Sequence, residues 1–126
     1  MRRPAAMADK PPQPTELRVS KDRRTLTVTF DSGESFDLAA EFLRVESPSA
    51  EVRGHGGDEK QIVPGKSQVT IRDAEPVGNY AVRLIFDDGH DTGLYSWAYL
   101  LTLGQRQGEL WAAYLEALAE RGLTRH

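Results

Sequence analysis

Cysteine is absent from this 126-residue sequence. Without cysteine the chain can form no disulfide, no thiolate-ligated zinc or iron–sulfur site and no cysteine nucleophile. An excess of basic residues is absent too, because 16 Lys and Arg face 19 Asp and Glu, which gives a formal net charge of −3. Nucleic-acid-binding domains usually carry a basic patch on a basic domain, so this composition argues against a nucleic-acid partner.

Long apolar segments are also missing. No apolar run approaches the roughly 18 residues that a membrane span needs. The Arg2-Arg3 pair near the start is not followed by the apolar stretch of a secretory signal. We therefore expect a cytoplasmic protein that makes no contact with a membrane.

Size and composition indicate one globular domain. The mass is 14.0 kDa and hydrophobic residues make up 39% of the chain, which suits a single core. The first 14 residues contain four prolines and almost no large apolar side chains. We interpret residues 1–14 as a disordered leader and residues 15–123 as a single domain. Inside that domain, residues 47–66 show no periodicity and predict a long loop.

Alternating apolar and polar residues predict short strands. Leu26, Val28 and Phe30 alternate with three threonines, which is the period-two pattern of a half-buried strand. The pattern is clearest between Tyr80 and Phe86. Weaker runs occur near residues 17–20, 35–37, 69–71 and 92–94.

Helical spacing appears after the first hairpin and again near the C-terminus. Asp37 offers an N-cap for a short helix over residues 38–45. Ser96 can cap a second helix that Gly104 ends, and a third helix covers residues 105–121. Strands first and helices last predict an α+β fold: a small antiparallel β-sheet of about five to six short strands, a short helix after the first hairpin, and C-terminal helices packed on one face.

The densest polar cluster lies in the turn after the clearest strand and comprises Asp87, Asp88, His90 and Asp91. Three carboxylates and an imidazole can hold a divalent metal such as zinc or iron, and His55 in the long loop could add a further ligand. The same residues fit a charged hairpin turn in which Gly89 takes a positive φ. From the residues alone, both interpretations stay open.

Catalytic patterns are weak elsewhere in the chain. Ser47, Ser49 and Ser96 lack the strand–turn–helix setting of a nucleophilic serine, and no orienting His–Asp pair is evident from spacing. Trp97 and Trp111 could stack on a ligand. Aromatic residues at helical spacing more often belong to a core, so we expect that role for both.

Two segments carry a family resemblance. Leu-Arg-Val-Glu-Ser-Pro-Ser-Ala-Glu at residues 43–51 and Asp-Gly-His-Asp-Thr-Gly-Leu-Tyr-Ser-Trp at residues 88–97 resemble motifs of the gamma-butyrobetaine hydroxylase-like N-terminal domain family. The resemblance covers about residues 14–103 and leaves the C-terminal helix, residues 105–121, outside it. Small stand-alone bacterial members are largely uncharacterised. Related domains are fused to P-loop iron–sulfur cluster carriers, which implies a link to cluster assembly.

The resemblance also implies a zinc site that this chain has lost. Zinc-bearing members use three cysteines and one histidine, at positions that correspond here to Ser47, Ser49, Val52 and His90. Serine hydroxyls are poor zinc ligands and valine is none. The resemblance therefore brings Ser47, Ser49 and His90 together without the structural metal, and we expect a hydrogen-bonded pin between loop and hairpin. Dioxygenase activity needs a separate jelly-roll domain, so we do not expect it here.

The resulting hypothesis is a non-catalytic accessory domain that binds another protein, such as an iron–sulfur assembly factor. We expect no resident cofactor. The alternative is a metal-binding protein with a weak oxygen- and nitrogen-ligated site around His90, in which Asp87, Asp88 or Asp91 would supply the carboxylates.

Overall fold

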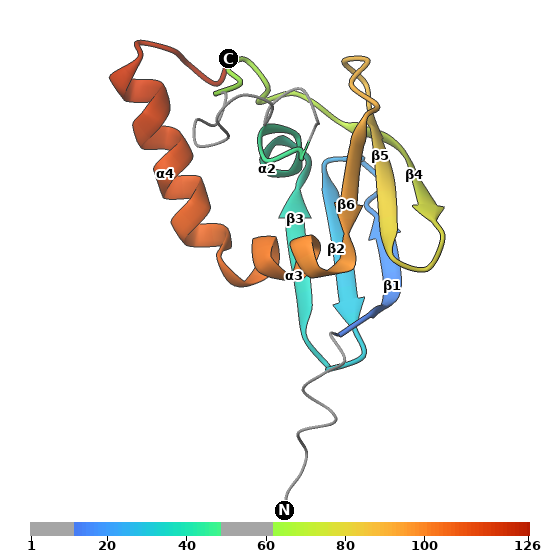
Figure 1. The fold of residues 1–126 in the computed structure, drawn as a ribbon. Helices are drawn as coiled ribbons and strands as arrows, with labels where there is room; N and C mark the ends of the chain where they lie inside the picture. Colours follow the sequence, from blue (N-terminus) through green and yellow to red (C-terminus); the bar gives the residue numbers. More distant parts are fainter. Residues whose placement is uncertain (1–11, 49–61) are drawn as a thin grey trace, which may run out of the picture.

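The computed structural model describes residues 12–48 and 62–126. These residues form an α+β fold, as predicted, with a strand-rich N-terminal part and helices at the C-terminal end (Figure 1). The strands of the described part are β1 (Pro14–Val19), β2 (Thr25–Phe30), β3 (Ser35–Ala39), β4 (Ile71–Val77), β5 (Ala81–Phe86) and β6 (Gly93–Ser96). The helices are α2 (Ala40–Val45), α3 (Trp97–Gln105) and α4 (Gln107–Glu120).

The six described strands divide into two antiparallel sheets of three, in the orders β1-β2-β3 and β4-β5-β6. A backbone hydrogen bond of 2.8 Å from the Ile71 amide to the Arg23 carbonyl links the two sheets. The core combines the alternating apolar residues of the central strands β2 and β5 with side chains from α2, β6 and α3. Its members at 0% exposure include Leu26, Val28, Leu38, Leu43, Ile71, Val82, Leu84, Phe86, Tyr95 and Leu100.

Strand pairing corrects one expectation about the first helix. Asp37 does not cap it, because β3 pairs with β2 as far as Ala39 and the helix begins only at Ala40. The Asp37 carboxylate instead accepts a 2.7 Å hydrogen bond from Thr27 across the sheet. The N-cap position is occupied by Ala39, which has no capping side chain. The ladder hydrogen bonds of a paired strand outweigh a local capping preference.

The start and the end of α3 differ in how well the sequence predicts them. Ser96 caps the helix as predicted, since its hydroxyl accepts a 3.1 Å hydrogen bond from the Tyr99 amide. Gly104 does not end the helix, which continues to Gln105. A Cβ at residue 104 would lie 2.4 Å from the ring of Phe36, so this glycine allows α3 to pack closely on β3. The missing side chain serves packing rather than termination.

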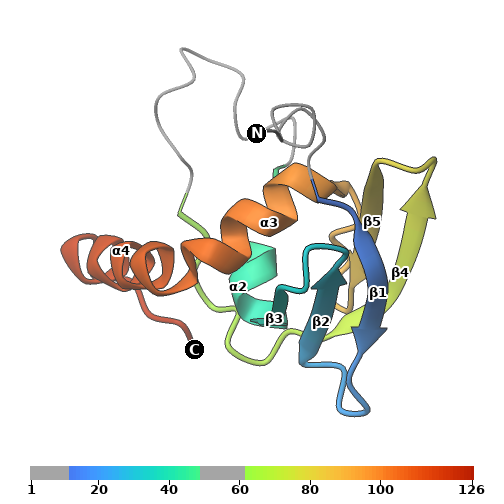
Figure 2. The ribbon, with the colours of Figure 1, turned by 90° about the horizontal axis from the view of Figure 1, so that it is seen from below.

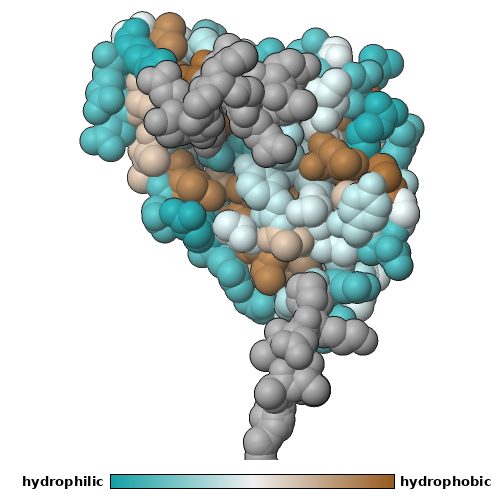
Figure 3. Space-filling view, viewed as in Figure 1, coloured by the Kyte–Doolittle hydropathy of each residue, from teal (hydrophilic) through white to brown (hydrophobic). Residues whose placement is uncertain are grey.

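Helix α4 lies beyond α2 at the side of the molecule, in both ribbon views (Figures 1 and 2). Tyr114 and Leu118 pack there against Val45 in a second, smaller apolar cluster. Apolar surface appears beside α4 in Figure 3, and further apolar patches lie on the opposite side of the same view. After Gly122, with φ of +67°, the chain turns back across α2. Within the described ranges, no helix has the length and apolar character needed to cross a bilayer.

The C-terminal tail is held to the segment that precedes β4. The amides of Gly65 and Ser67 donate hydrogen bonds of 3.0 Å to the carbonyls of Thr124 and Arg125. This pairing places the Arg125 side chain beside α2, where it contributes to the cavity discussed below.

Candidate functional site

The β5–β6 hairpin brings His90 against Ser47, which follows α2. The Ser47 Oγ lies 2.9 Å from His90 Nε2, although the residues are 43 positions apart in sequence. The imidazole also packs beside the ring of Phe86, with centroids 6.2 Å apart. The hydrogen bond expected between these two residues is thus confirmed. Ser49, Val52 and His55, the other residues named for this region, lie outside the described part of the chain.

Gly93 and Tyr95 close one side of this partly buried pair. A Cβ at Gly93 would lie 2.7 Å from Ser47 Oγ and 2.9 Å from the ring of Tyr95. Tyr95 is fully buried, and its hydroxyl donates to the carbonyl of Leu43 in α2. Gly93 and Tyr95 both lie within the second motif.

Two stacked tyrosines continue this packing towards α3. The rings of Tyr95 and Tyr99 lie 6.1 Å apart, and the Tyr99 hydroxyl donates a 2.6 Å hydrogen bond to the carbonyl of Glu46. Burial raises the pKa of Tyr95, and it raises the pKa of Tyr99 to about 12 with a further contribution from the charge of Glu46. Both phenols therefore stay protonated and act as hydrogen-bond donors to the end of α2.

The carboxylate of Asp88 forms ion pairs with two cationic side chains of the protein itself. Its Oδ2 accepts from Arg44 Nε at 2.9 Å and from Lys66 Nζ at 2.5 Å, while Oδ1 accepts from the His90 amide at 3.0 Å. Partial burial alone would raise the pKa of Asp88, but the hydrogen bonds from Lys66, the His90 amide and Arg44 lower it to about 2. The carboxylate therefore ties the hairpin tip to α2 and to the segment before β4.

The other two aspartates of the predicted cluster contact other groups, Asp87 through its carboxylate and Asp91 through its main-chain carbonyl. Asp87 Oδ1 accepts a 3.0 Å hydrogen bond from the Thr70 amide, and the carbonyl of Asp91 accepts from Arg83 Nη1 at 3.0 Å. Gly89 has φ of +92°, as the hairpin-turn interpretation requires. Across residues 12–48 and 62–126, no three His, Asp or Glu side chains converge as a metal site. With a serine hydroxyl on His90 and two cations on Asp88, the described residues do not fit the zinc of the family.

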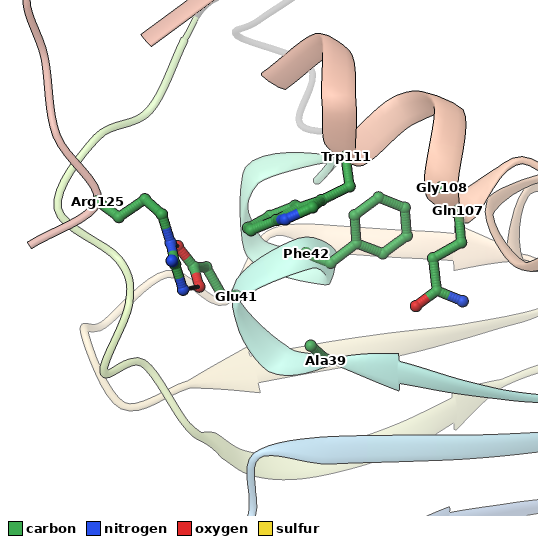
Figure 4. A pocket seen from close by; sticks show the side chains of 7 residues that line it. All are labelled: Ala39, Glu41, Phe42, Gln107, Gly108, Trp111 and Arg125. Carbon is green, nitrogen blue, oxygen red and sulfur yellow. Dashed lines mark hydrogen bonds and ion pairs between the residues drawn. The ribbon is translucent and has the colours of Figure 1, made fainter. Parts of the chain in front are cut away.

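A cavity of about 490 Å³ lies between α2 and α4, and its lining comprises Ala39, Glu41, Phe42, Gln107, Gly108, Trp111 and Arg125. In Figure 4 the Trp111 indole and the Phe42 ring lie side by side; Gln107 stands at one end and Arg125 and Glu41 at the other. The two rings meet edge to face, with centroids 6.2 Å apart. Ala39 and Gly108 are exposed, so the cavity opens to solvent. Volumes of this size are typical of ligand-binding pockets.

One end of the cavity carries a bidentate ion pair. Arg125 Nε and Nη2 donate to the two carboxylate oxygens of Glu41 at 2.9 and 2.8 Å, and these hydrogen bonds raise the pKa of Arg125. The guanidinium carbon also lies 5.4 Å from the centre of the Trp111 ring, within cation–π range. The partners are 84 residues apart, and no local signal in the sequence points to their contact.

The two tryptophans have different surroundings. Trp111 packs at the edge of the core and also faces the cavity. Trp97 packs against the core, and its indole Nε1 donates a 2.7 Å hydrogen bond to the carbonyl of Asn79. The expectation that aromatic residues at helical spacing belong to the core holds for both. The structure adds a second, solvent-facing role for Trp111.

Fold and site together define a small α+β domain with a hydrogen-bonded hairpin pin and a separate aromatic cavity. The sequence profile described as gamma-butyrobetaine hydroxylase-like, N-terminal, matches residues 17–101. The chain belongs to this family.

Solved structures resemble the chain over most of its length. Two protein structures determined in solution by NMR share 47% and 44% sequence identity with it, each with a TM-score of 0.79. The first match covers 90% of both chains, and the second covers 99% of this chain and 91% of the other.

A third similar structure is the crystal structure of a protein of unknown function of the DUF971 family from Acidithiobacillus ferrooxidans ATCC 23270. It shares 41% identity with a TM-score of 0.62, over 73% of this chain and 92% of that one. No curated protein matches the chain. The comparisons thus establish a family whose structurally characterised members include a stand-alone domain of unknown function.

Proposed function

We propose that this protein is a non-catalytic accessory domain that acts by binding another protein. The observation that carries the proposal is the cavity between α2 and α4, where the half-buried Trp111 indole lines an opening to solvent. The ring of Phe42, which is 2% exposed, packs beneath this indole, and Ala39 and Gly108 leave the cavity open. Solvent-accessible aromatic residues in a recess are typical of protein-binding sites.

The chemistry of the cavity lining supports binding rather than turnover. Its ionisable side chains, Glu41 and Arg125, hydrogen-bond to each other through both carboxylate oxygens. Neither is therefore disposed to act as a general base or acid. Among the described residues of the lining there is no serine, threonine, histidine or lysine that could act as a nucleophile.

The Ser47–His90 pair supports the same conclusion. A hydroxyl at 2.9 Å from an imidazole nitrogen resembles the nucleophile–base contact of a hydrolase. Gly93 and Tyr95 approach Ser47 so closely that even a methyl group on residue 93 has no room. We therefore interpret the pair as a structural link between α2 and the β5–β6 hairpin.

An iron–sulfur assembly factor is our proposed class of partner. Its support is the resemblance to domains that are fused to P-loop iron–sulfur carriers. A weak metal site around His90 was the alternative to protein binding. No contact among the described residues favours that alternative, because Asp88 and His90 are engaged by protein groups.

Affinity capture tests the proposal. The purified full chain is immobilised and incubated with extract of the organism that encodes it, and bound proteins are identified by mass spectrometry. We expect a reproducible partner whose capture saturates with bait concentration, and we expect an iron–sulfur assembly protein among the captured set. Recovery of no partner, together with turnover of a small substrate by the pure protein, would contradict the accessory role. Capture of an unrelated protein would contradict the finer assignment alone.

A further inference from the structure

The two side chains of the ion pair at the end of the cavity differ in their exposure to solvent. The Arg125 side chain is 39% exposed, whereas the Glu41 side chain is 9% exposed. A molecule that enters the cavity therefore meets more of the guanidinium than of the carboxylate. The guanidinium is the more accessible partner of the pair, and it can donate a hydrogen bond to a carboxylate of a ligand.

Arg125 is also held in place before any ligand arrives. Two of its nitrogens bind Glu41, and its guanidinium lies over the Trp111 ring. Within residues 12–48 and 62–126, its Nη1 donates no side-chain hydrogen bond. A fixed guanidinium with donors to spare loses little conformational entropy when it binds an anion.

The rest of the cavity suits a short stretch of polypeptide. Gly108 and Ala39 carry little or no side chain, so a main chain can approach α4 and β3 closely. Gln107 stands at the end opposite Arg125, and its side-chain amide can both donate to and accept from a peptide group. Between these ends, the half-buried indole of Trp111, which packs on the buried ring of Phe42, offers an apolar surface for one side chain.

We propose that this cavity binds a short acidic segment of the partner protein. An apolar side chain of the segment packs on the Trp111 indole, and a neighbouring carboxylate binds the more exposed guanidinium of Arg125. The main chain of the segment passes Gly108 towards Gln107. This inference rests on the proposed function as a protein-binding domain and names the chemistry of the partner.

Titration of the 15N-labelled full chain with two peptides tests the inference. The first is acetyl-Ala-Leu-Glu-Leu-Ala-amide, and the second replaces its Glu with Gln. With the acidic peptide we expect saturable NMR shifts at the Trp111 indole and at the amides of Gly108 and Arg125. The Trp97 indole, which binds Asn79, serves as an internal reference that stays unchanged. The Gln peptide is expected to bind about 3- to 10-fold more weakly, the range of a partly exposed charge-assisted contact.

A matched pair of variants on α4 locates the binding site. A Cβ at Gly108 meets no atom within 4 Å, so Gly108→Leu adds a side chain to the open cavity without displacing a neighbour. We expect about tenfold or greater loss of peptide binding with a thermal midpoint that does not fall, since leucine favours a helix more than glycine does. Ala113→Leu places the same side chain at an exposed position that does not line the cavity, and it is expected to bind normally. Arg125→Gln is expected to abolish the preference for Glu over Gln.

Several results would overturn the inference. They are equal binding of the Glu and Gln peptides, no shifts with either peptide, and unchanged binding by Gly108→Leu. Concentration-dependent shifts of the Trp111 indole without peptide would indicate a second copy of the chain as occupant. In the capture experiment, equal recovery of a partner by wild type and Gly108→Leu would refute the cavity as its site while leaving the proposed function intact. Recovery of no partner would instead count against the proposed function.

Discussion

Replacing Asp88 with asparagine removes a carboxylate that Arg44 and Lys66 share at the hairpin tip. The pKa of Asp88 falls from 3.8 to about 2 in the folded protein. At about 1.36 kcal/mol per pKa unit, this corresponds to at most about 2.5 kcal/mol of stability. The Asp88 side chain is 19% exposed, so solvent screening reduces the expected loss in Asp88→Asn to about 1–2 kcal/mol at pH 7.

The pH dependence of this loss distinguishes the ion pairs from simple packing. A folded-state pKa below the unfolded value stabilises the protein at pH values above about 4. That stabilisation disappears as the pH falls towards about 2, because the carboxylate becomes protonated in both states. The free energy of unfolding of wild type should therefore approach that of Asp88→Asn between pH 4 and pH 2.

Urea unfolding followed by circular dichroism at pH 7, 5, 3 and 2.5 measures the difference directly. Asp91→Asn is the control, because Asp91 contacts Arg83 through its carbonyl rather than through a side-chain hydrogen bond. We expect the control to differ from wild type by less than about 0.5 kcal/mol at every pH. A difference between wild type and Asp88→Asn that stays constant from pH 7 to pH 2.5 would refute the electrostatic explanation.

Three further substitutions probe the hairpin and its pin. Gly89→Val should destabilise the protein by about 1 kcal/mol or more, because a β-branched residue is strained at a φ of +92°; an unchanged thermal midpoint would refute this turn geometry. Gly93→Ala should cost about 1–3 kcal/mol in urea unfolding, since its methyl group would overlap Ser47 Oγ, whereas Gly108→Ala on open surface should not destabilise. Elemental analysis should find equal zinc and iron contents in wild type and His90→Ala, and a loss of metal confined to the variant would show that His90 is a ligand.

Local signals predicted the elements whose partners are close in sequence. The alternation in β2 and β5 identified the strands of the core, and Ser96 was recognised as a cap because its partner, Tyr99, is three residues away. The turn at Gly89 followed from residue types that tolerate a positive φ. The prediction failed at Asp37 and Gly104, whose roles depend on a paired strand and on Phe36 from another part of the chain.

The two candidate sites also differ in whether the sequence predicted their contacts. The Ser47–His90 contact was expected from two sequence motifs, because a family resemblance carries spatial information that the residues alone do not. The cavity had no such signal. Its ion pair joins Glu41 to Arg125 across 84 residues, and Trp111 was expected to be a core residue.

By itself, the sequence determined which chemistry is absent. It also determined where apolar residues alternate in strands, where the chain turns at Gly89 and where Ser96 caps a helix. The lack of cysteine excludes thiolate zinc whatever the fold, and the period of the apolar residues sets which side chains face the core. The tertiary structure alone decided that the C-terminal tail meets α2. Folding of the C-terminal tail over α2 brings Arg125 to Glu41 and Trp111, and these contacts form one end of a recess that is open to solvent.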